Sequence, residues 1–275
     1  MKRDTYKIKK LKDLVLFENE DLVVFNKPPM WTCGVDRALE GANSFTDLVN
    51  KHYGKELLLC HRLDKSTSGC LVMAKTEEAH RDLNLQFQNR AVAKTYHALI
   101  GGTHYVKDEV LRFPVHKSGN KIASINYGLG KEAITEIATL EAFQHYTLLS
   151  CFPQTGRFHQ IRIHLAHTKR PIVGDALYKG PDIFLSNFKP KFKNRKKPSL
   201  EAKSLDGRTE HTMHQLAEVA EKRALQEEKP IIERTALHAY ELKFKLPGSN
   251  DTKTFQADYP KDFNAAVKQL RKYDK

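Results

Sequence analysis

Short apolar runs separated by polar turns recur through the first third of the chain. Residues 14–17 and 22–25 flank a mostly acidic stretch and predict two paired strands. Residues 56–60 and 70–74 are largely apolar runs of strand length, which predicts two buried strands. The polar residues 61–69 are therefore expected to lie where buried strands end.

Helical patterns alternate with further strand patterns in the rest of the chain. Ser44 and Thr76 precede expected helices over residues 45–53 and 77–90, because their hydroxyls can cap free backbone N–H groups. The remaining expected elements are helices over residues 158–168 and after Pro260, and strands at residues 92–100, 110–115, 122–127, 133–142, 147–152, 236–239 and 242–246.

Charge narrows the class of partner. The 275 residues include 46 Lys and Arg against 33 Asp and Glu, a formal net charge of +13. Such an excess favours a polyanion, nucleic acid first and an anionic membrane second, unless the lysines are merely solvated. No stretch approaches the roughly 20 apolar residues that span a bilayer. Four cysteines without a Cys-x-x-Cys pair argue against zinc-ribbon and redox sites and predict free thiols in a reducing cytoplasm.

Residues 61–69 carry more polar chemistry than a turn requires. They contain Asp64, Arg62 and Lys65 together with His61, three hydroxyl residues and a glycine. Burying such groups is costly unless each one is paired. Two readings stay open: a polar turn whose groups satisfy one another, or a site built around Asp64.

A second stretch gives an independent argument. If residues 158–168 form a helix with about 100° per residue, Phe158, Ile161 and Leu165 make one apolar stripe. Arg162 then falls beside that stripe, on the side facing the core. A buried guanidinium needs a carboxylate partner, and Asp64 is the expected one. The alternative is that Arg162 reaches solvent along its aliphatic stem.

These stretches resemble the motifs of the RluA-type RNA pseudouridine synthases. Residues 61–69 resemble the active-site motif His-Arg-Leu-Asp-x-x-Thr-Ser-Gly, and residues 155–164 resemble Thr-Gly-Arg-x-His-Gln-Ile-Arg-x-His. Asn-Lys-Pro at residues 26–28 resembles the first motif, but Pro29 and Met30 follow where the family usually has a small residue and glycine. Further similar segments are Lys-x-Tyr-x-Ala at residues 94–98, Pro-Ile-x-Gly-Asp-x-x-Tyr at 171–178 and Leu-His-Ala at 237–239.

The resemblance implies a fold and a set of roles. The fold would be α+β, with a mixed, mainly antiparallel sheet, flanking helices and a central basic cleft. The reaction would be isomerisation of a uridine in structured tRNA or rRNA, with Asp64 as the catalytic carboxylate paired to Arg162. Tyr96, by itself an ordinary core aromatic, would stack on the displaced base, and Arg62 would help fill the space that the base leaves. Lys94, Arg157 and His159 are expected to contact RNA phosphates.

Pseudouridine formation breaks the bond from C1′ to N1, turns the base and joins C1′ to C5, without a redox step. No cofactor is expected, because the sequence has neither a Gly-x-Gly-x-x-Gly fingerprint nor a P-loop. An ionised Asp64 would attack the nucleoside or abstract a ribose proton to give a glycal, and both routes stay open. A close arginine favours the ionised form. His164 and His167 share a helix face without a nearby carboxylate, so no metal is expected.

The expected organisation is a tail of residues 1–13 followed by one catalytic domain over residues 14–275. A basic and helical insert over about residues 181–235 separates two segments that lie close together in the family pattern. The insert is expected either to contact RNA or to form a solvated loop. The protein is expected to be a monomer.

A non-catalytic RNA-binding or ribosome-assembly protein on the same scaffold is the main alternative. The presence of Asp64, Tyr96 and Arg162 argues against it. A metal-dependent nuclease would need clustered carboxylates, and the chain around Asp64 offers none. Replacing Asp64 with Asn separates catalysis from binding, because only binding should survive in that variant.

Overall fold

A ten-stranded sheet forms the centre of the molecule. The computed structural model describes residues 10–34, 44–119, 122–188 and 228–275. The sheet order is β1-β2-β4-β11-β5-β10-β9-β6, with β3 pairing with β4 and β12 with β11. Only the β4–β11 pair is parallel, so the expected α+β fold with a mixed, mainly antiparallel sheet is confirmed. The strands are β1 Val15–Glu18, β2 Leu22–Lys27, β3 Leu58–Leu59, β4 Ser68–Ala74, β5 Ala93–Gly101, β6 Glu109–Arg112, β9 Ile134–Ala142, β10 Tyr146–Pro153, β11 Leu237–Lys245 and β12 Thr252–Gln256.

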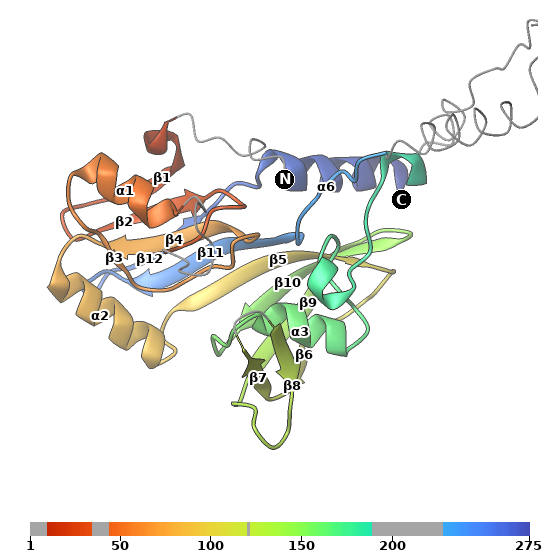
Figure 1. Ribbon diagram of the computed structural model, residues 1–275, viewed down its shortest axis with the longest axis horizontal. Coiled ribbons are helices and arrows are strands. Elements are labelled where there is room, and N and C mark those ends of the chain that lie inside the picture. Colours follow the sequence, from red (N-terminus) through yellow and green to blue (C-terminus); the bar gives the residue numbers. More distant parts are fainter. Residues whose placement is uncertain (1–9, 35–43, 120–121, 189–227) are drawn as a thin grey trace, which may run out of the picture.

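Helices cover both faces of the sheet (Figure 1). At one end, α1 (Phe45–Tyr53) and α2 (Glu77–Gln88) lie on opposite faces. Strand β2 therefore buries both sides: Leu22 and Val24 belong to the cluster with α2, and Val23 and Phe25 to the cluster with α1. At the other end, α3 (Gln160–His167) and α6 (Lys261–Tyr273) pack against β5, β10 and β9.

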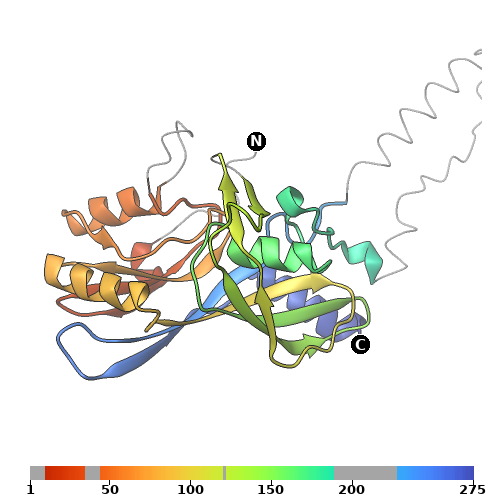
Figure 2. The same ribbon diagram turned by 90° about the horizontal axis from the view of Figure 1, so that it is seen from below.

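A small hairpin stands beside α3, and both views show the two next to each other (Figures 1 and 2). Its strands are β7 (Val115–Ser118) and β8 (Ile122–Ile125). Val115 and Ala123 pack with Phe158 and Ile163 in a separate apolar cluster. Three short 3₁₀ helices complete the described elements: η1 Leu11–Leu14, η2 Ala176–Tyr178 and η3 Leu185–Asn187.

The capping predictions are confirmed. The hydroxyl of Ser44 accepts the N–H of Asp47 at 3.2 Å, and that of Thr76 accepts the N–H of Ala79 at 3.2 Å. Four strand predictions need correction. Residues 110–115 are not one strand, because β6 ends before Pro114, which has no N–H for a ladder. Residues 56–60 form only the two-residue β3, and the two expected strands at 236–239 and 242–246 are the single strand β11.

The parallel pairing of β4 with β11 requires a glycine. Ser68 and Gly69 lie opposite His238 and Ala239. Gly69 has φ +114, and a Cβ there would stand 2.1 Å from the carbonyl oxygen of Ala239. The two backbones therefore approach closely directly after the polar stretch 61–69.

Part of the expected domain organisation lies outside the described residues, including 1–9 and the greater part of the insert, 189–227. In the described chain, Leu11 is buried against β2 and α1 residues. No described helix is long and apolar enough to cross a membrane.

Candidate active site

Asp64 begins a tight turn between β3 and β4, and three hydrogen bonds to its backbone carbonyl groups hold this turn. Within the turn, the N–H of Thr67 donates to the carbonyl of Asp64 at 3.0 Å. The carbonyl of Lys65 accepts the N–H of Met30 at 2.7 Å. The carbonyl of Ser66 accepts Nη1 of Arg234 at 2.8 Å. The turn that carries the carboxylate is therefore fixed by segments distant in the sequence.

The expected contact between Arg162 and Asp64 is present. Nη1 of Arg162 donates to Oδ2 of Asp64 at 3.2 Å. The other side of the guanidinium is bound more closely, because Nε and Nη2 donate to the two carboxylate oxygens of Asp175 at 2.7 and 2.8 Å. Side-chain exposure is 25% for Asp64, 8% for Arg162 and 1% for Asp175. Asp64 is thus the carboxylate of this pair that faces the open cavity.

Burial disfavours the charged form of Arg162, but Asp175 and Asp64 outweigh it and raise the pKa of the guanidinium. Arg162 therefore stays cationic beside Asp64. The bidentate grip of Asp175 also fixes the plane of the guanidinium, so that its free edge is turned toward Asp64.

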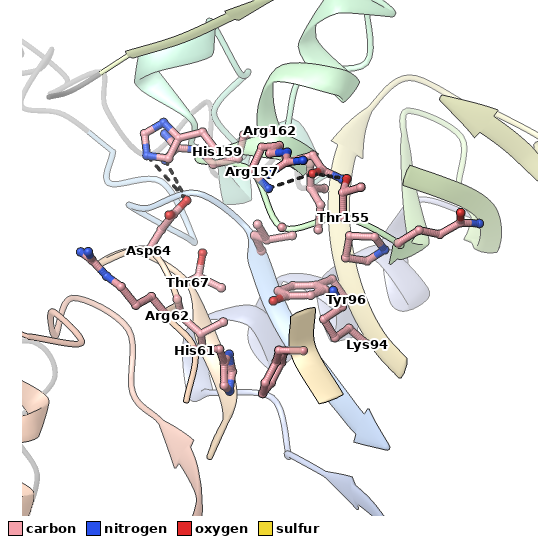
Figure 3. A pocket seen from close by; sticks show the side chains of 18 of the residues that line it. His61, Arg62, Asp64, Thr67, Lys94, Tyr96, Thr155, Arg157, His159 and Arg162 are labelled. Atoms are coloured by element: carbon pink, nitrogen blue, oxygen red, sulfur yellow. Dashed lines mark hydrogen bonds and ion pairs between the residues drawn. The ribbon is translucent and has the colours of Figure 1, made fainter. Parts of the chain in front are cut away.

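Tyr96 lies on the central strand β5, opposite Cys151 of β10 and Ala239 of β11. Its ring packs against the apolar clusters of both halves of the sheet. Burial and the nearby Asp64 raise the pKa of its hydroxyl, so the side chain is neutral. In Figure 3 the ring lies across the floor of the cavity below Asp64.

A cavity of about 640 Å³ joins these groups. This volume lies within the range of small-molecule sites, roughly 300–1,000 Å³. The lining combines one carboxylate, Asp64, with apolar surface and several cations. These cations are Arg62, Arg90, Lys94, Arg157 and Arg162.

The comparisons with known proteins identify the family. The model of the RNA pseudouridylate synthases matches residues 21–167, more than half of the chain. The chain belongs to this family. Membership places this pseudouridine synthase among the isomerases.

Several curated relatives are ribosomal enzymes by name. The chain is 28% identical over 270 residues to "Ribosomal large subunit pseudouridine synthase D" of Zymomonas mobilis, covering 93% of this chain and 72% of the relative. It is 34% identical over 173 residues to "Ribosomal large subunit pseudouridine synthase C" of Vibrio vulnificus, covering 62% of this chain and 55% of the relative. Against the synthase D of Xylella fastidiosa the identity is 36% over 180 residues, and 51% of the relative is covered. The chain thus spans only about half the length of several relatives.

Solved structures support the fold. "Human RNA Pseudouridylate Synthase Domain Containing 4" superposes with a TM-score of 0.62 at 22% identity, covering 95% of this chain and 94% of that one. "Human RNA Pseudouridylate Synthase Domain Containing 1" gives a TM-score of 0.60 at 18% identity, covering 98% and 100%. At these identities the likeness concerns the fold alone.

The residues expected to contact RNA lie around the cavity of the synthase in different settings. Arg62 is exposed, and Figure 3 shows its guanidinium on the side of Asp64 away from Arg162. Lys94 is half-buried, and burial and the neighbouring Arg90 lower its pKa. Arg157 donates through Nε to the carbonyl of Glu132 at 2.9 Å. All three are at the cavity, whereas their contacts with RNA stay a prediction.

His159, expected to contact a phosphate, lies directly beside Asp64. Its Nε2 is 3.7 Å from Oδ2 of Asp64, and its Nδ1 is 3.0 Å from the hydroxyl oxygen of Tyr178. The ring is stacked on Phe158, with centroids 3.8 Å apart.

The sequence does not predict the contacts of two residues at the site, Asp175 and Arg234. Asp175 was assigned only to the segment 171–178, yet it is the closest partner of Arg162. Arg234 was not singled out, although it is buried and also binds Asp262 in the first turn of α6, at 2.7 and 3.2 Å. A signal for Asp175 was present: a buried arginine demands carboxylates, and the Gly-Asp of the 171–178 segment follows the arginine closely.

Within the described residues, no group of three His, Cys, Asp or Glu side chains could hold a metal ion. His164 is buried, and its Nε2 lies 2.9 Å from the carbonyl oxygen of Phe113, which accepts its hydrogen bond. His167 is exposed, and its ring lies against that of Phe113.

Proposed function

We propose that this synthase isomerises a specific uridine of large-subunit ribosomal RNA to pseudouridine, with Asp64 as the catalytic carboxylate. The observation that carries the proposal is the chain of contacts from Asp175 through Arg162 to Asp64 at the edge of the cavity. The guanidinium of Arg162, fixed in this way, lies 3.2 Å from the carboxylate that would carry out the reaction. The names of the relatives from Zymomonas mobilis and Vibrio vulnificus favour ribosomal RNA over tRNA.

In the proposed reaction each of these groups has a stated role. The target base leaves its stack, which costs a few kcal/mol, and lies against the ring of Tyr96. Asp64 then either attacks the nucleoside or removes a ribose proton, and the bond from C1′ to N1 breaks. The detached uracil turns within the cavity and C5 bonds to C1′. In the first route this bond displaces Asp64 from C1′, and in the second the ribose regains its proton. C5 loses a proton and N1 gains one, so the product is an isomer of the substrate. Arg62 helps fill the space that the base has left, and Lys94 and Arg157 bind phosphates.

The test uses ribosomal RNA and tRNA from cells that lack the gene. Pseudouridines are mapped with and without complementation by the wild type, by Asp64→Asn and by Asp47→Asn. Asp47 is a matched control, because it is an exposed aspartate in the first turn of α1. We expect one site in large-subunit RNA to vanish and to return with the wild type and Asp47→Asn, but not with Asp64→Asn.

Binding is measured in parallel, and the RNA dissociation constant of Asp64→Asn should stay within about twofold of the wild type, because the phosphate contacts are unchanged. Full restoration by Asp64→Asn would falsify the catalytic role of Asp64. Loss of a tRNA site instead of a ribosomal one would contradict the proposed substrate. If no site changes although the RNA is bound, the protein is a non-catalytic RNA-binding protein.

A further inference from the structure

His159 has an unusual backbone conformation directly before α3. Its φ is 52°, in the left-handed region that residues other than glycine seldom adopt. Such strain persists where the surrounding structure requires it, and it concentrates at functional sites. Here the conformation accompanies a ring that lies beside Asp64, and Figure 3 shows the two side chains facing each other.

Tyr178 contacts Nδ1 of that ring through its hydroxyl group. The N–H of Ala123 donates to the hydroxyl oxygen of Tyr178 at 2.9 Å. The proton of this hydroxyl is then free to point at Nδ1 of His159, 3.0 Å away. With the hydroxyl oxygen already accepting from Ala123, donation of its proton to Nδ1 favours the neutral imidazole that carries its proton on Nε2.

Charge favours the same tautomer. The opposite tautomer would turn the lone pair of Nε2 toward a carboxylate at 3.7 Å, which is repulsive. Burial lowers the pKa of His159, and Arg162 lowers it further, against the opposing effects of Asp64 and Asp175. A further cation lies near His159. The ammonium group of Lys117 is 5.2 Å from the centroid of the Phe158 ring, on which His159 stacks.

We propose that His159 is a second donor to Asp64, acting as a neutral imidazole with its proton on Nε2, and that Tyr178 sets this tautomer. The inference rests on the proposed function in one respect, that Asp64 is the reacting carboxylate. The present 3.7 Å separation is longer than a hydrogen bond, and contacts of this kind shorten when substrate fills a site. A neutral donor adds orientation to Asp64 without a second full charge beside Arg162.

One short segment therefore supports both donors to Asp64. Asp175 holds Arg162, and Tyr178, three residues later, holds His159. The N–H of Tyr178 donates to the carbonyl of Asp175 at 3.1 Å, which joins the two supports in one turn. The segment 171–178 thus contacts Arg162 and His159, the two residues beside Asp64.

Kinetics separate this role from a phosphate contact. His159→Phe keeps a flat ring and removes the donor, His159→Gln keeps an N–H donor, and Tyr178→Phe removes one hydroxyl. We expect His159→Phe to lower kcat about 10- to 100-fold with an unchanged RNA dissociation constant, because a hydrogen bond to a charged group is lost. His159→Gln should recover part of that loss, and Tyr178→Phe should lower kcat less. His167→Phe, on the exposed side of α3, is the matched control and should behave as the wild type.

The opposite pattern would overturn the inference. If His159 binds a phosphate, His159→Phe raises the dissociation constant and reduces its dependence on salt, while kcat at saturating RNA is kept. An unchanged kcat in both His159→Phe and Tyr178→Phe would likewise overturn it. Should His159→Phe fail to fold, Tyr178→Phe and His159→Gln still decide the matter.

The tautomer itself is measured in the intact protein without any turnover. In ¹⁵N-labelled protein at pH 7, imidazole spectra should show His159 protonated at Nε2 and unprotonated at Nδ1, with a mixture of tautomers in Tyr178→Phe. A proton on Nδ1, or on both nitrogens, would contradict the inference. This readout is independent of the role of Asp64, so an active Asp64→Asn variant would refute the proposed function and leave the spectrum to decide on His159.

Discussion

Arg162 is the residue on which the geometry of the candidate site depends. Its guanidinium bridges a buried carboxylate, Asp175, and a partly exposed one, Asp64. The two bonds to Asp175 satisfy the donors that face the core, which leaves the remaining edge for Asp64. Burying an arginine whose only partner is the partly exposed Asp64 would destabilise the fold. The two bonds to Asp175 offset that cost and allow Arg162 to be buried beside Asp64.

Replacing Asp175 with Asn tests this dependence. The amide keeps the size of the carboxylate but loses its charge and one of the two acceptors, so Arg162 is left undercompensated in the core. We expect the free energy of unfolding to fall by about 3 kcal/mol and kcat/KM to fall at least tenfold. Urea denaturation and kinetics measure the two effects. Asp182→Asn, at an exposed position shortly after it, should change neither, and an Asp175→Asn variant with native activity would contradict the account.

Met30 adopts a backbone conformation that residues other than glycine seldom take. It stands where the family usually has glycine, and its φ is 66°. Its N–H holds the carbonyl of Lys65 in the Asp64 turn. A methionine thus adopts here, at some cost in strain, a left-handed conformation that glycine takes freely.

At the scale of elements, the Asp64 turn is braced by the segment that enters β11. Arg234 donates to the carbonyl of Ser66, and the ring of His238 is 2.9 Å from the hydroxyl of Ser68. Arg234 is in turn fixed by Asp262 at the start of α6. A C-terminal helix and strand therefore position a turn that lies in the first quarter of the chain.

Arg234→Lys should separate positioning from general stability. Lysine keeps the charge but cannot bind Asp262 with two donors and Ser66 with a third. We expect a loss of about 3 kcal/mol of unfolding free energy and about tenfold in kcat, with KM unchanged, measured where all variants remain folded.

Arg170→Lys is the matched control for that variant. Arg170 binds Glu109 with two donors, and Glu109 lies on β6 at the edge of the sheet, away from the β4 strand that follows the Asp64 turn. It should lose stability and keep kcat. Equal kcat losses in the two variants would mean that Arg234 acts only through overall stability.

At the scale of the whole molecule, buried neutral histidines make the free energy of unfolding depend on pH in the acid range. Burial lowers the pKa of His97 to about 4 and that of His238 to about 3, from the ordinary 6.5. Between about pH 4 and 6.5 the unfolded chain therefore binds more protons than the folded one. Stability is full above pH 6.5 and is lost as the pH falls through this window.

Urea denaturation between pH 7 and 5 should show this loss, at up to about 1.4 kcal/mol per pH unit for each histidine. His238→Gln should flatten the slope, and exposed His167→Gln should leave it unchanged. The carboxylates with lowered pKa, Glu18 and Glu109, titrate below 4.5 and so act outside this range. A flat profile from pH 7 to 5 would contradict the assignment of both histidines as neutral and buried.

Local patterns in the sequence were enough to predict the caps at Ser44 and Thr76, the helix that carries Arg162, the strand that carries Tyr96 and the contact of Arg162 with Asp64. Hydroxyl caps, apolar periodicity and the cost of an unpaired buried charge act over a few residues or through one strong constraint, so they can be read from the chain. The same reasoning joined residues 110–115 into one strand although Pro114 interrupts them, because strand boundaries depend on partners.

Only the tertiary structure decided which distant groups support the site. Asp175, Tyr178 and Arg234 act on Arg162, His159 and the Asp64 turn through contacts that no periodicity encodes. The sequence by itself determined which residues are candidates for the chemistry, since one carboxylate, one arginine and one tyrosine stand in recognisable motifs. The packing, which pairs β4 with β11 and sets Arg162 of α3 against Asp64, determined their orientation, because buried polar groups take whichever partners the packing places within reach.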